Sequence, residues 1–491
     1  MGSDVGVDKK PNELIHVLMI SFPGQGHVNP LLRLGKLIAS HGFLITFVTY
    51  EDFGRGMRAS NDSITSEPVP VGDGFIRFEF IDDGLKSDDP VRKDMDKHLQ
   101  HMESVGRRWV RDALTRMERE ARPVSCLINN AFLAWVSDAA EEVGLPSAVL
   151  WPQSCASFLI YYYFHHSLTQ FPTENSPEID IEIPTLPLLK WDEIPSFLHP
   201  TTPYPYLRRA ILEQFKNITK PSSILMDTFY ELEKNTIDFT LKLLGQTTVR
   251  PIGPLFKKTV SGSSQIRADS CKPDTECLKW LDGQPEHSVV YISMGTVAYL
   301  KQEQVDEMAA GLEAAGVSFL WVDKPPPPEH NINPHTIPQD FLDRVGDKGK
   351  VISFSPQEQV LAHPALACFM THCGWNSSME AITLGVPVIA FPQWGDQVTD
   401  AKFLCDVFGM GKLLCRGEHD KKIIPRDEIE RCLREATLGP KAAEMKENAL
   451  KWKVTATEAI ADDGSSDLNF RSFVEEIRES SKRVLACANG H

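Results

Sequence analysis

The sequence has no long apolar segment and no excess of basic charge. No run approaches the roughly 18 apolar residues that a membrane-spanning helix needs, because Gly, Pro or a charged residue interrupts the longest apolar stretches. The 491 residues include 51 Lys and Arg against 67 Asp and Glu, a formal net charge of −16. A protein that binds nucleic acid normally carries a basic patch. We therefore expect neither a membrane span nor a nucleic-acid partner.

Cysteine pairs and a secretion signal are also missing. The ten cysteines are scattered along the chain without a CxxC pair, a pattern typical of reduced, buried thiols rather than of disulfides or a zinc site. Residues 1–11 are polar and have no apolar signal-peptide core. These features predict a cytoplasmic protein without a bound metal, and no pattern indicates a protein partner.

What the sequence does contain is a regular alternation of strand-like and helical segments. Residues 14–21 form a short apolar run, followed by the Gly-rich stretch 22–27 and a periodic segment with Asn29 as its expected N-cap and Pro30 at the first helical position. Similar units recur throughout the first half, and strand-like runs restart at residue 289. This alternation predicts an α/β protein built on parallel sheets.

The same pattern divides the chain into two domains. A polar, Ser-rich stretch without helical or strand periodicity follows residue 250. We expect a first domain over residues 1–250, a linker over 251–275 and a second domain over 276–460. A C-terminal helix is expected over 461–491, and periodicity leaves open whether it packs back on the first domain. Ligands in such paired domains bind in the cleft at the carboxyl ends of the strands.

Polar residues, glycine and tryptophan concentrate in residues 354–397. A histidine and a glycine precede Asn376 and Ser377 at the start of a predicted helix, where free backbone N–H groups suit a phosphate. Ser377 and Glu380 also have the spacing of a capping box. Core packing is the alternative for Trp375, and a structural hydrogen bond is the alternative for His372. Each residue alone leaves these alternatives open.

Taken together, these residues resemble the signature box of the plant family 1 UDP-dependent glycosyltransferases of secondary metabolism. The chain has His-Cys-Gly-Trp-Asn-Ser at 372–377, and its box ends in Asp396-Gln397. Pro-Gly-Gln-Gly-His at 23–27 and Tyr-Ile-Ser-Met-Gly-Thr at 291–296 extend the similarity over the whole chain. The resemblance implies two Rossmann-like domains facing across a cleft, the GT-B fold. It also implies a UDP-sugar co-substrate and a small aromatic acceptor, without a further cofactor.

The resemblance assigns a role to each residue of the donor site. Phe354 would stack on uracil, where the family normally has Trp, and the smaller ring offers less stacking area. The other assignments are Gln357 to the nucleoside, Glu380 to the ribose, His372, Asn376, Ser377, Ser293 and Thr296 to the diphosphate, and Trp375, Asp396 and Gln397 to the sugar. A terminal Gln in this box usually accompanies glucose, so UDP-glucose is the expected donor.

In the first domain, His27 matches the general base of the family. Imidazole suits this role because its ordinary pKa lies near neutral pH. Relatives that glucosylate hydroxyl groups pair this His with an Asp, but this chain has Asn130 at that position. A carboxylic acid needs no such base, because it is already ionised at pH 7. The chain resembles the branch that glucosylates hydroxycinnamic and hydroxybenzoic acids, which implies an inverting transfer that forms 1-O-β-glucose esters, with phenolic hydroxyls as further acceptors.

The acceptor pocket is predicted from the irregular parts of the first domain. Gln25, Trp151, Gln153 and Phe197 are its candidates, with core packing as the alternative for the aromatic residues. Two other functions stay open: a catalytically silent nucleotide-sugar-binding protein, which Asn130 would favour, and an NAD(P)-dependent oxidoreductase. The stretch 24–29 lacks the third glycine of GxGxxG, which weakens the oxidoreductase alternative.

Overall fold

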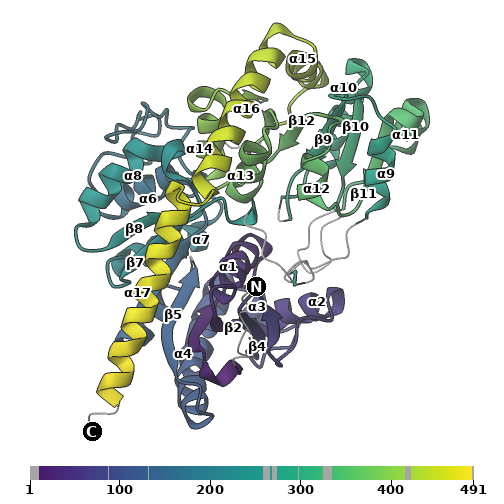
Figure 1. Ribbon diagram of the computed structural model, residues 1–491. Coiled ribbons are helices and arrows are strands. Elements are labelled where there is room, and N and C mark those ends of the chain that lie inside the picture. Colours follow the sequence, from purple (N-terminus) through teal and green to yellow (C-terminus); the bar gives the residue numbers. More distant parts are fainter. Residues whose placement is uncertain are drawn as a thin grey trace.

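The computed structural model contains two β-sheets, one mostly and one entirely parallel, each covered by helices on both faces (Figure 1). It describes residues 10–86, 88–130, 132–257, 266–267, 274–296, 298–324, 334–414 and 422–488. Most of the predicted linker, at 258–265 and 268–273, lies outside these residues. The predicted α/β class with two Rossmann-like sheets is confirmed.

The first sheet has eight strands and belongs to the N-terminal half. Only β3 and β4 pair antiparallel. In spatial order the strands are β3 (Val69–Val71), β4 (Gly74–Ile81), β2 (Phe43–Tyr50), β1 (Ile15–Ile20), β5 (Val124–Asn130), β6 (Ser147–Trp151), β7 (Ser223–Met226) and β8 (Thr248–Pro251). Every residue of β2 is buried, as expected for a parallel strand with helices on both sides. The helices of this half are α1 (Gln25–Ala39), α2 (Glu51–Ser60), α3 (Pro90–Lys93), α4 (Met95–Arg119), α5 (Trp135–Glu142), α6 (Cys155–His165), α7 (Pro205–Glu213) and α8 (Tyr230–Leu244).

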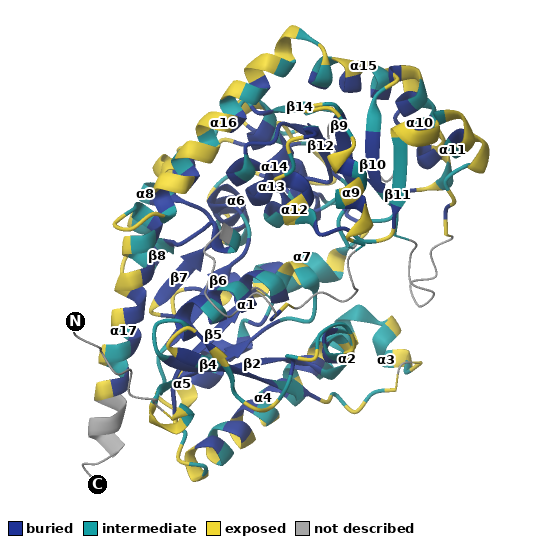
Figure 2. Ribbon diagram, turned by 45° about the vertical axis from the view of Figure 1, so that its right-hand side comes forward, coloured by how far each residue is buried: buried dark blue, intermediate teal, exposed yellow. Residues whose placement is uncertain are grey.

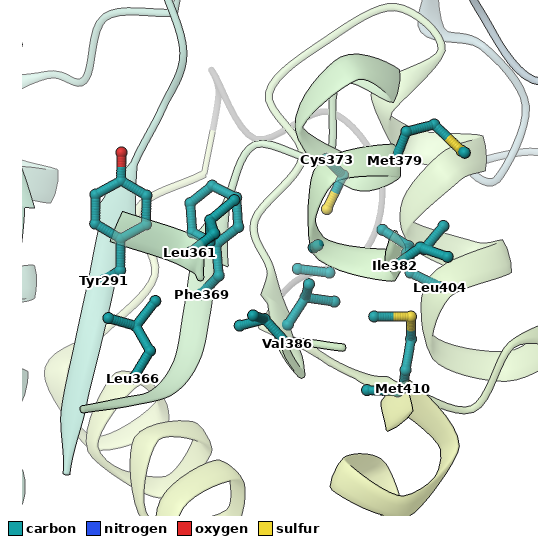
Figure 3. Close-up of a cluster of buried hydrophobic side chains, with 14 of the residues drawn as sticks. Tyr291, Leu361, Leu366, Phe369, Cys373, Met379, Ile382, Val386, Leu404 and Met410 are labelled. Atoms are coloured by element: carbon teal, nitrogen blue, oxygen red, sulfur yellow. The ribbon is translucent and has the colours of Figure 1, made fainter. Parts of the chain in front are cut away.

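The second sheet has six parallel strands. Their spatial order is β11 (Gly349–Ile352), β10 (Ser318–Val322), β9 (Val289–Ser293), β12 (Leu366–Thr371), β13 (Val388–Ala390) and β14 (Gly411–Leu413). The accompanying helices are α9 (Glu276–Asp282), α10 (Gln302–Ala315), α11 (Gln339–Val345), α12 (Gln357–Leu361), α13 (Trp375–Leu384), α14 (Gln397–Lys402), α15 (Arg426–Thr437) and α16 (Pro440–Ile460). Figure 3 shows part of the core between this sheet and its helices, where Tyr291 and Phe369 stack and Met379 and Ile382 of α13 pack inward.

The last helix, α17 (Ser465–Ala488), lies on the first domain (Figure 1). Phe470, Phe473 and Ile477 are buried in the core of the first sheet. Asn469 donates to the carbonyl O of Pro251 over 3.0 Å. The chain therefore leaves the second domain after α16 and ends on the first.

The start of α1 differs from the prediction. We expected the helix to begin at Asn29 and Pro30, but it begins at Gln25 with Gly24 as N-cap. Pro30 lies inside the helix, where it removes one backbone donor near the N-terminus. His27 is therefore held in the first turn of a helix rather than in a loop.

Burial follows the two sheets. Figure 2 shows that their strands are mostly buried, whereas exposed residues lie mainly on the outer helices and loops. Across the described ranges, no helix is long and apolar enough to cross a membrane.

Candidate functional site

The N-terminal ends of α1 and α13 meet between the two domains. The Nδ2 atom of Asn376 donates to the carbonyl O of Gly26 over 2.9 Å. Because Pro30 has no N–H, this carbonyl lacks its usual helical partner four residues later. Pro30 thus frees the carbonyl O of Gly26 for a contact with the second domain.

His372 lies against backbone beside the N-terminus of α13. A Cβ atom on Gly295 would lie 2.7 Å from the imidazole, and one on Gly374 would lie 2.5 Å from its Nε2 atom. Burial lowers the pKa of His372 to about 4, against a smaller opposing effect of the Ser293 backbone. Among the described residues, no side chain forms an N-cap hydrogen bond with the first turn of α13. An uncharged imidazole and free helical N–H groups together can bind a diphosphate.

Gln357 organises a polar network between α12 and α13. Its Nε2 atom donates to Oγ of Ser377 over 2.9 Å and to Oε2 of Glu380 over 2.8 Å. Its Oε1 atom accepts from the hydroxyl of Tyr291, which also bonds Ser355 over 2.6 Å. Five side chains are thereby held in one arrangement at the carboxyl end of the sheet.

The capping-box alternative for Ser377 and Glu380 is wrong. The N-cap of α13 is Gly374, and it forms no side-chain cap. Glu380 instead accepts from Arg33 of α1 over 3.1 Å in addition to its bond with Gln357. Tertiary contacts therefore engage both residues that the spacing had suggested for a local cap.

Trp375 belongs to the core between the domains. Its side chain is buried, and its indole N–H donates to the carbonyl O of Asp227 over 2.8 Å. The packing alternative thus describes this side chain, which is committed to an interdomain hydrogen bond. The sugar contact that the resemblance implied is not available to the indole N–H in this arrangement.

Asp396 and Gln397 lie where the loop after β13 meets the first domain. Gln153 hydrogen-bonds the carboxyl of Asp396, so the structure brings together residues predicted for the acceptor and for the sugar. Burial raises the pKa of Asp396 to about 6. The Oε1 atom of Gln397 accepts from the backbone N–H groups of Gln393 and Trp394 at 3.0 and 3.2 Å.

The remaining donor-site candidates follow neighbouring strands of the second sheet. Phe354 is half-buried after β11, and its carbonyl O accepts from the N–H of Asp274 over 2.8 Å. Ser293 ends β9, and Thr296 lies in the loop that follows it. These residues occupy the same end of the sheet as His372.

His27 lies between two aromatic rings. The centroid of its imidazole is 5.3 Å from that of Phe22 and 5.1 Å from that of Phe132, both edge-on. Its Nδ1 atom is buried and has no hydrogen-bond partner among the described residues. Burial lowers the pKa of His27 to about 4. The imidazole is therefore uncharged at neutral pH but is a weak base.

Asn130 contacts the backbone of His27 rather than its ring. Its Nδ2 atom donates to the carbonyl O of His27 over 2.8 Å and to Oγ of Ser21 over 3.0 Å. Its Oδ1 atom accepts from the N–H of Phe22 over 3.0 Å. Asn130 positions the start of α1, and the expected direct partnership with the imidazole is not observed.

Two acceptor candidates turn out to be core residues. Trp151 is fully buried and donates its indole N–H to the carbonyl O of Ser154. Phe197 is buried beneath Gly395, whose Cβ position lies 3.2 Å from the phenyl ring. Gln25 is half-buried at the first position of α1. We predicted an acceptor wall from these irregular parts of the first domain, but long-range packing places the rings of Trp151 and Phe197 inside.

A cavity of about 530 Å³ opens instead between α4, α5 and α7. Phe22 and Phe132 line it on the side of His27, and Trp135 and Tyr206 add further aromatic surface. Sequence reasoning missed these residues. The available signal was the position of Phe22 and Phe132 directly after β1 and β5, at the carboxyl end of the first sheet.

A metal site is not indicated by the residues that the structure describes, since no group of three or more His, Cys, Asp or Glu side chains could hold an ion there.

Comparisons with known proteins agree with this geometry. Residues 256–422 match the family described as UDP-glucoronosyl and UDP-glucosyl transferase. The limonoid UDP-glucosyltransferase of Citrus unshiu is 58% identical over 472 residues, covering 96% of this chain and 91% of that protein. The gallate 1-beta-glucosyltransferase 84A23 of Punica granatum is 56% identical over 475 residues, covering 97% and 93%. Among solved structures, Os79 from O. sativa in complex with UDP has a TM-score of 0.78 at 28% identity, over 94% of this chain and all of that one.

The two sheets and the site between them define a glycosyltransferase with the GT-B fold, as predicted. The chain belongs to the UDP-glucoronosyl and UDP-glucosyl transferase family. It is a UDP-glucosyltransferase, and a UDP-sugar is its co-substrate. We therefore set aside the oxidoreductase and the catalytically silent binder.

Proposed function

We propose that the enzyme transfers glucose from UDP-glucose to the carboxylate of a small aromatic acid and forms a 1-O-β-glucose ester. The observation that carries this proposal is the environment of His27, a half-buried imidazole with a buried Nδ1 atom, a pKa of about 4 and no carboxylate partner among the described residues. The relatives are named for limonoid and gallate acceptors, so their names alone do not decide the acceptor class.

The acid–base argument favours an acceptor that is already ionised. A phenol has a pKa of about 10, so transfer of its proton to a base of pKa about 4 is uphill by a factor of about 10⁶ in the equilibrium constant. A carboxylic acid with a pKa of about 4 has lost its proton at neutral pH. Such an acceptor brings its own nucleophile, and His27 then needs only to orient it.

The donor side supports UDP-glucose. Phe354 would stack on the uracil, and the network of Gln357, Ser377 and Glu380 would meet the nucleoside and ribose. Asp396 and Gln397 would bind the glucose hydroxyls. Because Gln153 hydrogen-bonds Asp396, the sugar would then lie beside Gln153 and the carboxyl end of the first sheet.

The reaction is a single displacement at the anomeric carbon. One oxygen of the acceptor carboxylate attacks C1 of the α-glucosyl group, the bond from C1 to the diphosphate oxygen breaks, and UDP leaves with the electron pair. The N–H groups at the start of α13 and the neighbouring His372 stabilise the charge that develops on the diphosphate. Attack from the opposite side inverts the configuration, so the product is a β-glucose ester.

The aromatic part of the acceptor would occupy the space beside Phe22 and Phe132. Ring faces and edges of these residues suit a planar aromatic acid. The cavity of about 530 Å³ behind them offers room for ring substituents. A cytoplasmic location stays a prediction.

The test is an incubation of the purified protein with UDP-glucose and either cinnamic acid or a flavonol. We expect UDP release with the acid and a product that mild alkali cleaves, as an ester requires. An alkali-stable glucoside formed from the flavonol, with little product from the acid, would contradict the proposed acceptor class. Lack of UDP release with every aromatic acid tested would contradict it as well.

A further inference from the structure

Arg33 of α1 is an unusual link between the domains because it is bonded to a residue of the donor site. Its Nη2 atom lies 3.1 Å from Oε1 of Glu380 in α13, and it also forms an ion pair with Glu358 of α12. The guanidinium carbon lies 5.6 Å from the ring centroid of Phe256. An arginine of the acceptor domain thus reaches a carboxylate of the opposite domain.

Helical spacing explains how one pair of helices makes this connection. Gly26 and Arg33 are two turns apart on α1, while Asn376 and Glu380 are one turn apart on α13. Gly26 meets Asn376 and Arg33 meets Glu380. The contact between the domains therefore uses Glu380, which the proposed function places on the ribose, and Asn376, which the resemblance assigns to the diphosphate.

The Glu380 carboxyl lies in a buried environment that disfavours its ionised form. Only 7% of its side chain is exposed, and burial raises its pKa. Arg33 acts in the opposite direction, whereas the charge of Glu358 adds to the increase. Tyr291 of β9 faces the same carboxyl as a neutral phenol, and Asp227 acts on Arg33 from beyond β7.

We infer that Arg33 is a positioning residue for the donor, because it holds Glu380 as an oriented anion that accepts the ribose hydroxyls. Arg33 occupies Oε1 and Gln357 occupies Oε2, and each carboxylate oxygen retains a second lone pair for a hydroxyl. A neutral Glu380 would lose part of this accepting capacity. The inference rests on the proposed function, in which Glu380 meets the ribose.

Selectivity between ribose and 2′-deoxyribose tests this role directly. We would measure the affinity of the full chain for UDP and for 2′-deoxy-UDP by titration calorimetry. The wild type should bind UDP at least about 10-fold more tightly, since a hydrogen bond to a charged group is lost with the 2′-hydroxyl. Arg33→Met should reduce this ratio to near that of Glu380→Gln, and Arg33→Lys, which keeps the charge, should give an intermediate ratio.

Glu358→Gln is the matched control. This substitution removes the ion pair between Arg33 and Glu358, whose side chain is 47% exposed, and keeps the ion pair between Arg33 and Glu380. If Arg33 served only to hold the domains together, Glu358→Gln and Arg33→Met should weaken UDP and 2′-deoxy-UDP equally. The positioning role predicts that Glu358→Gln preserves the ratio.

A pH series gives an independent readout. Without Arg33 the pKa of Glu380 rises further, so the carboxylate is lost at a higher pH as the solution is acidified. The KM for UDP-glucose of Arg33→Met should therefore increase between pH 8 and pH 6 by a larger factor than that of the wild type, while kcat changes little.

The possible outcomes test the role of Arg33 separately from the proposed contact between Glu380 and the ribose. A wild-type ratio in both Arg33 variants, with a reduced ratio in Glu380→Gln, would overturn the role of Arg33 alone. A wild-type ratio in Glu380→Gln would instead overturn the assignment of Glu380 to the ribose. If Arg33→Met does not fold, the ratio of Arg33→Lys decides: the wild-type value would overturn the inference, and an intermediate value would support it.

Discussion

The two histidines of the site have similar protonation but different surroundings. Burial lowers the pKa of both His27 and His372 to about 4. His372 lies against the backbone of Gly295 and Gly374, beside a helix N-terminus. His27 lies between aromatic rings. The comparison shows that loss of solvent lowers both pKa values although one imidazole lies against backbone and the other lies between aromatic rings.

The consequence for catalysis lies in what each imidazole can do. A neutral His372 can donate one hydrogen bond to a diphosphate without needing a positive charge. A neutral His27 of such low pKa can orient an acceptor but is a poor acceptor of a phenolic proton. This difference is the basis of the proposed preference for acceptors that arrive as anions.

The largest expected effect comes from an acceptor that carries both a carboxylate and a phenol. It distinguishes orientation of the acceptor by His27 from removal of a proton by His27. 4-Hydroxycinnamate carries a carboxylate and a phenol, so ester and phenolic glucoside can form in one assay. His27→Gln should lower phenolic glucoside formation by about 10²-fold, the lower end of the range for a general base because the pKa of His27 lies well below neutral pH, and ester formation by about 10-fold or less. Alkali lability of the products gives the ratio. Equal losses for both products would contradict the difference between the acceptor groups.

On the donor side, Gly374→Ala should displace His372. The new Cβ would lie 2.5 Å from Nε2 of the imidazole, and such overpacking costs about 1–3 kcal/mol. We expect UDP affinity to fall by about 10- to 100-fold in a calorimetric titration. Gly283→Ala is the control in the same domain, because its Cβ would come no closer than 3.4 Å to another atom. Unchanged UDP affinity in Gly374→Ala would exclude His372 from the diphosphate site.

Asn130→Asp should make the His27 side more like that of an enzyme for hydroxyl groups. A carboxylate near the imidazole favours its charged form, so the pKa of His27 should rise from about 4 toward its ordinary value of about 6.5. Phenolic glucoside formation should then increase about 10-fold relative to ester at pH 8 and decline as the pH falls through 6.5 and His27 gains a proton.

The geometry also predicts a cost of this substitution. A carboxylate oxygen at the Nδ2 position would lie close to the carbonyl O of His27, which now accepts a hydrogen bond over 2.8 Å. Asn130→Ala removes the same bond without adding charge. A pH profile that shifts equally in Asn130→Asp and Asn130→Ala would show that the charge is not the cause.

The smallest effect tests the interdomain core. Trp375→Phe removes the indole N–H and leaves the buried carbonyl O of Asp227 without this donor. We expect a loss of about 1–3 kcal/mol in the free energy of unfolding, measured with urea, and little change in the KM for UDP-glucose. A large increase in KM at unchanged stability would show that the indole contacts the sugar.

The sequence predicted the donor half better than the acceptor half. His372, Asn376, Ser377 and Glu380 stand close together in the chain, and one strand and one helix place them at the same sheet edge. Because these residues are close together in the sequence, local secondary structure alone predicts that they share one region.

The acceptor half depends on contacts that spacing does not reveal. Trp151 has a packing environment set by α6 and by Phe215, 64 residues further along the chain. Arg33 reaches Glu380 across 347 positions of sequence. Spacing along the chain therefore does not reveal which way the ring of Trp151 is packed.

The start of α1 shows a local error with a physical cause. Pro30 suggested a helix beginning because proline is favoured in the first turn. The helix instead begins five residues earlier, and Asn376 of the other domain satisfies the carbonyl that Pro30 leaves free. Only the folded pair of domains supplies that partner.

The central claim is that His27 is an uncharged, weak base, and its pKa can be measured directly. The chain has 15 histidines, so we would label them with ¹³C at Cε1 and assign the His27 signal by its loss in His27→Gln. The account predicts that this signal titrates with a pKa near 4 and is unchanged between pH 6 and pH 8. A pKa of 6.5 or above would contradict it, because His27 would then be a competent base for phenolic acceptors.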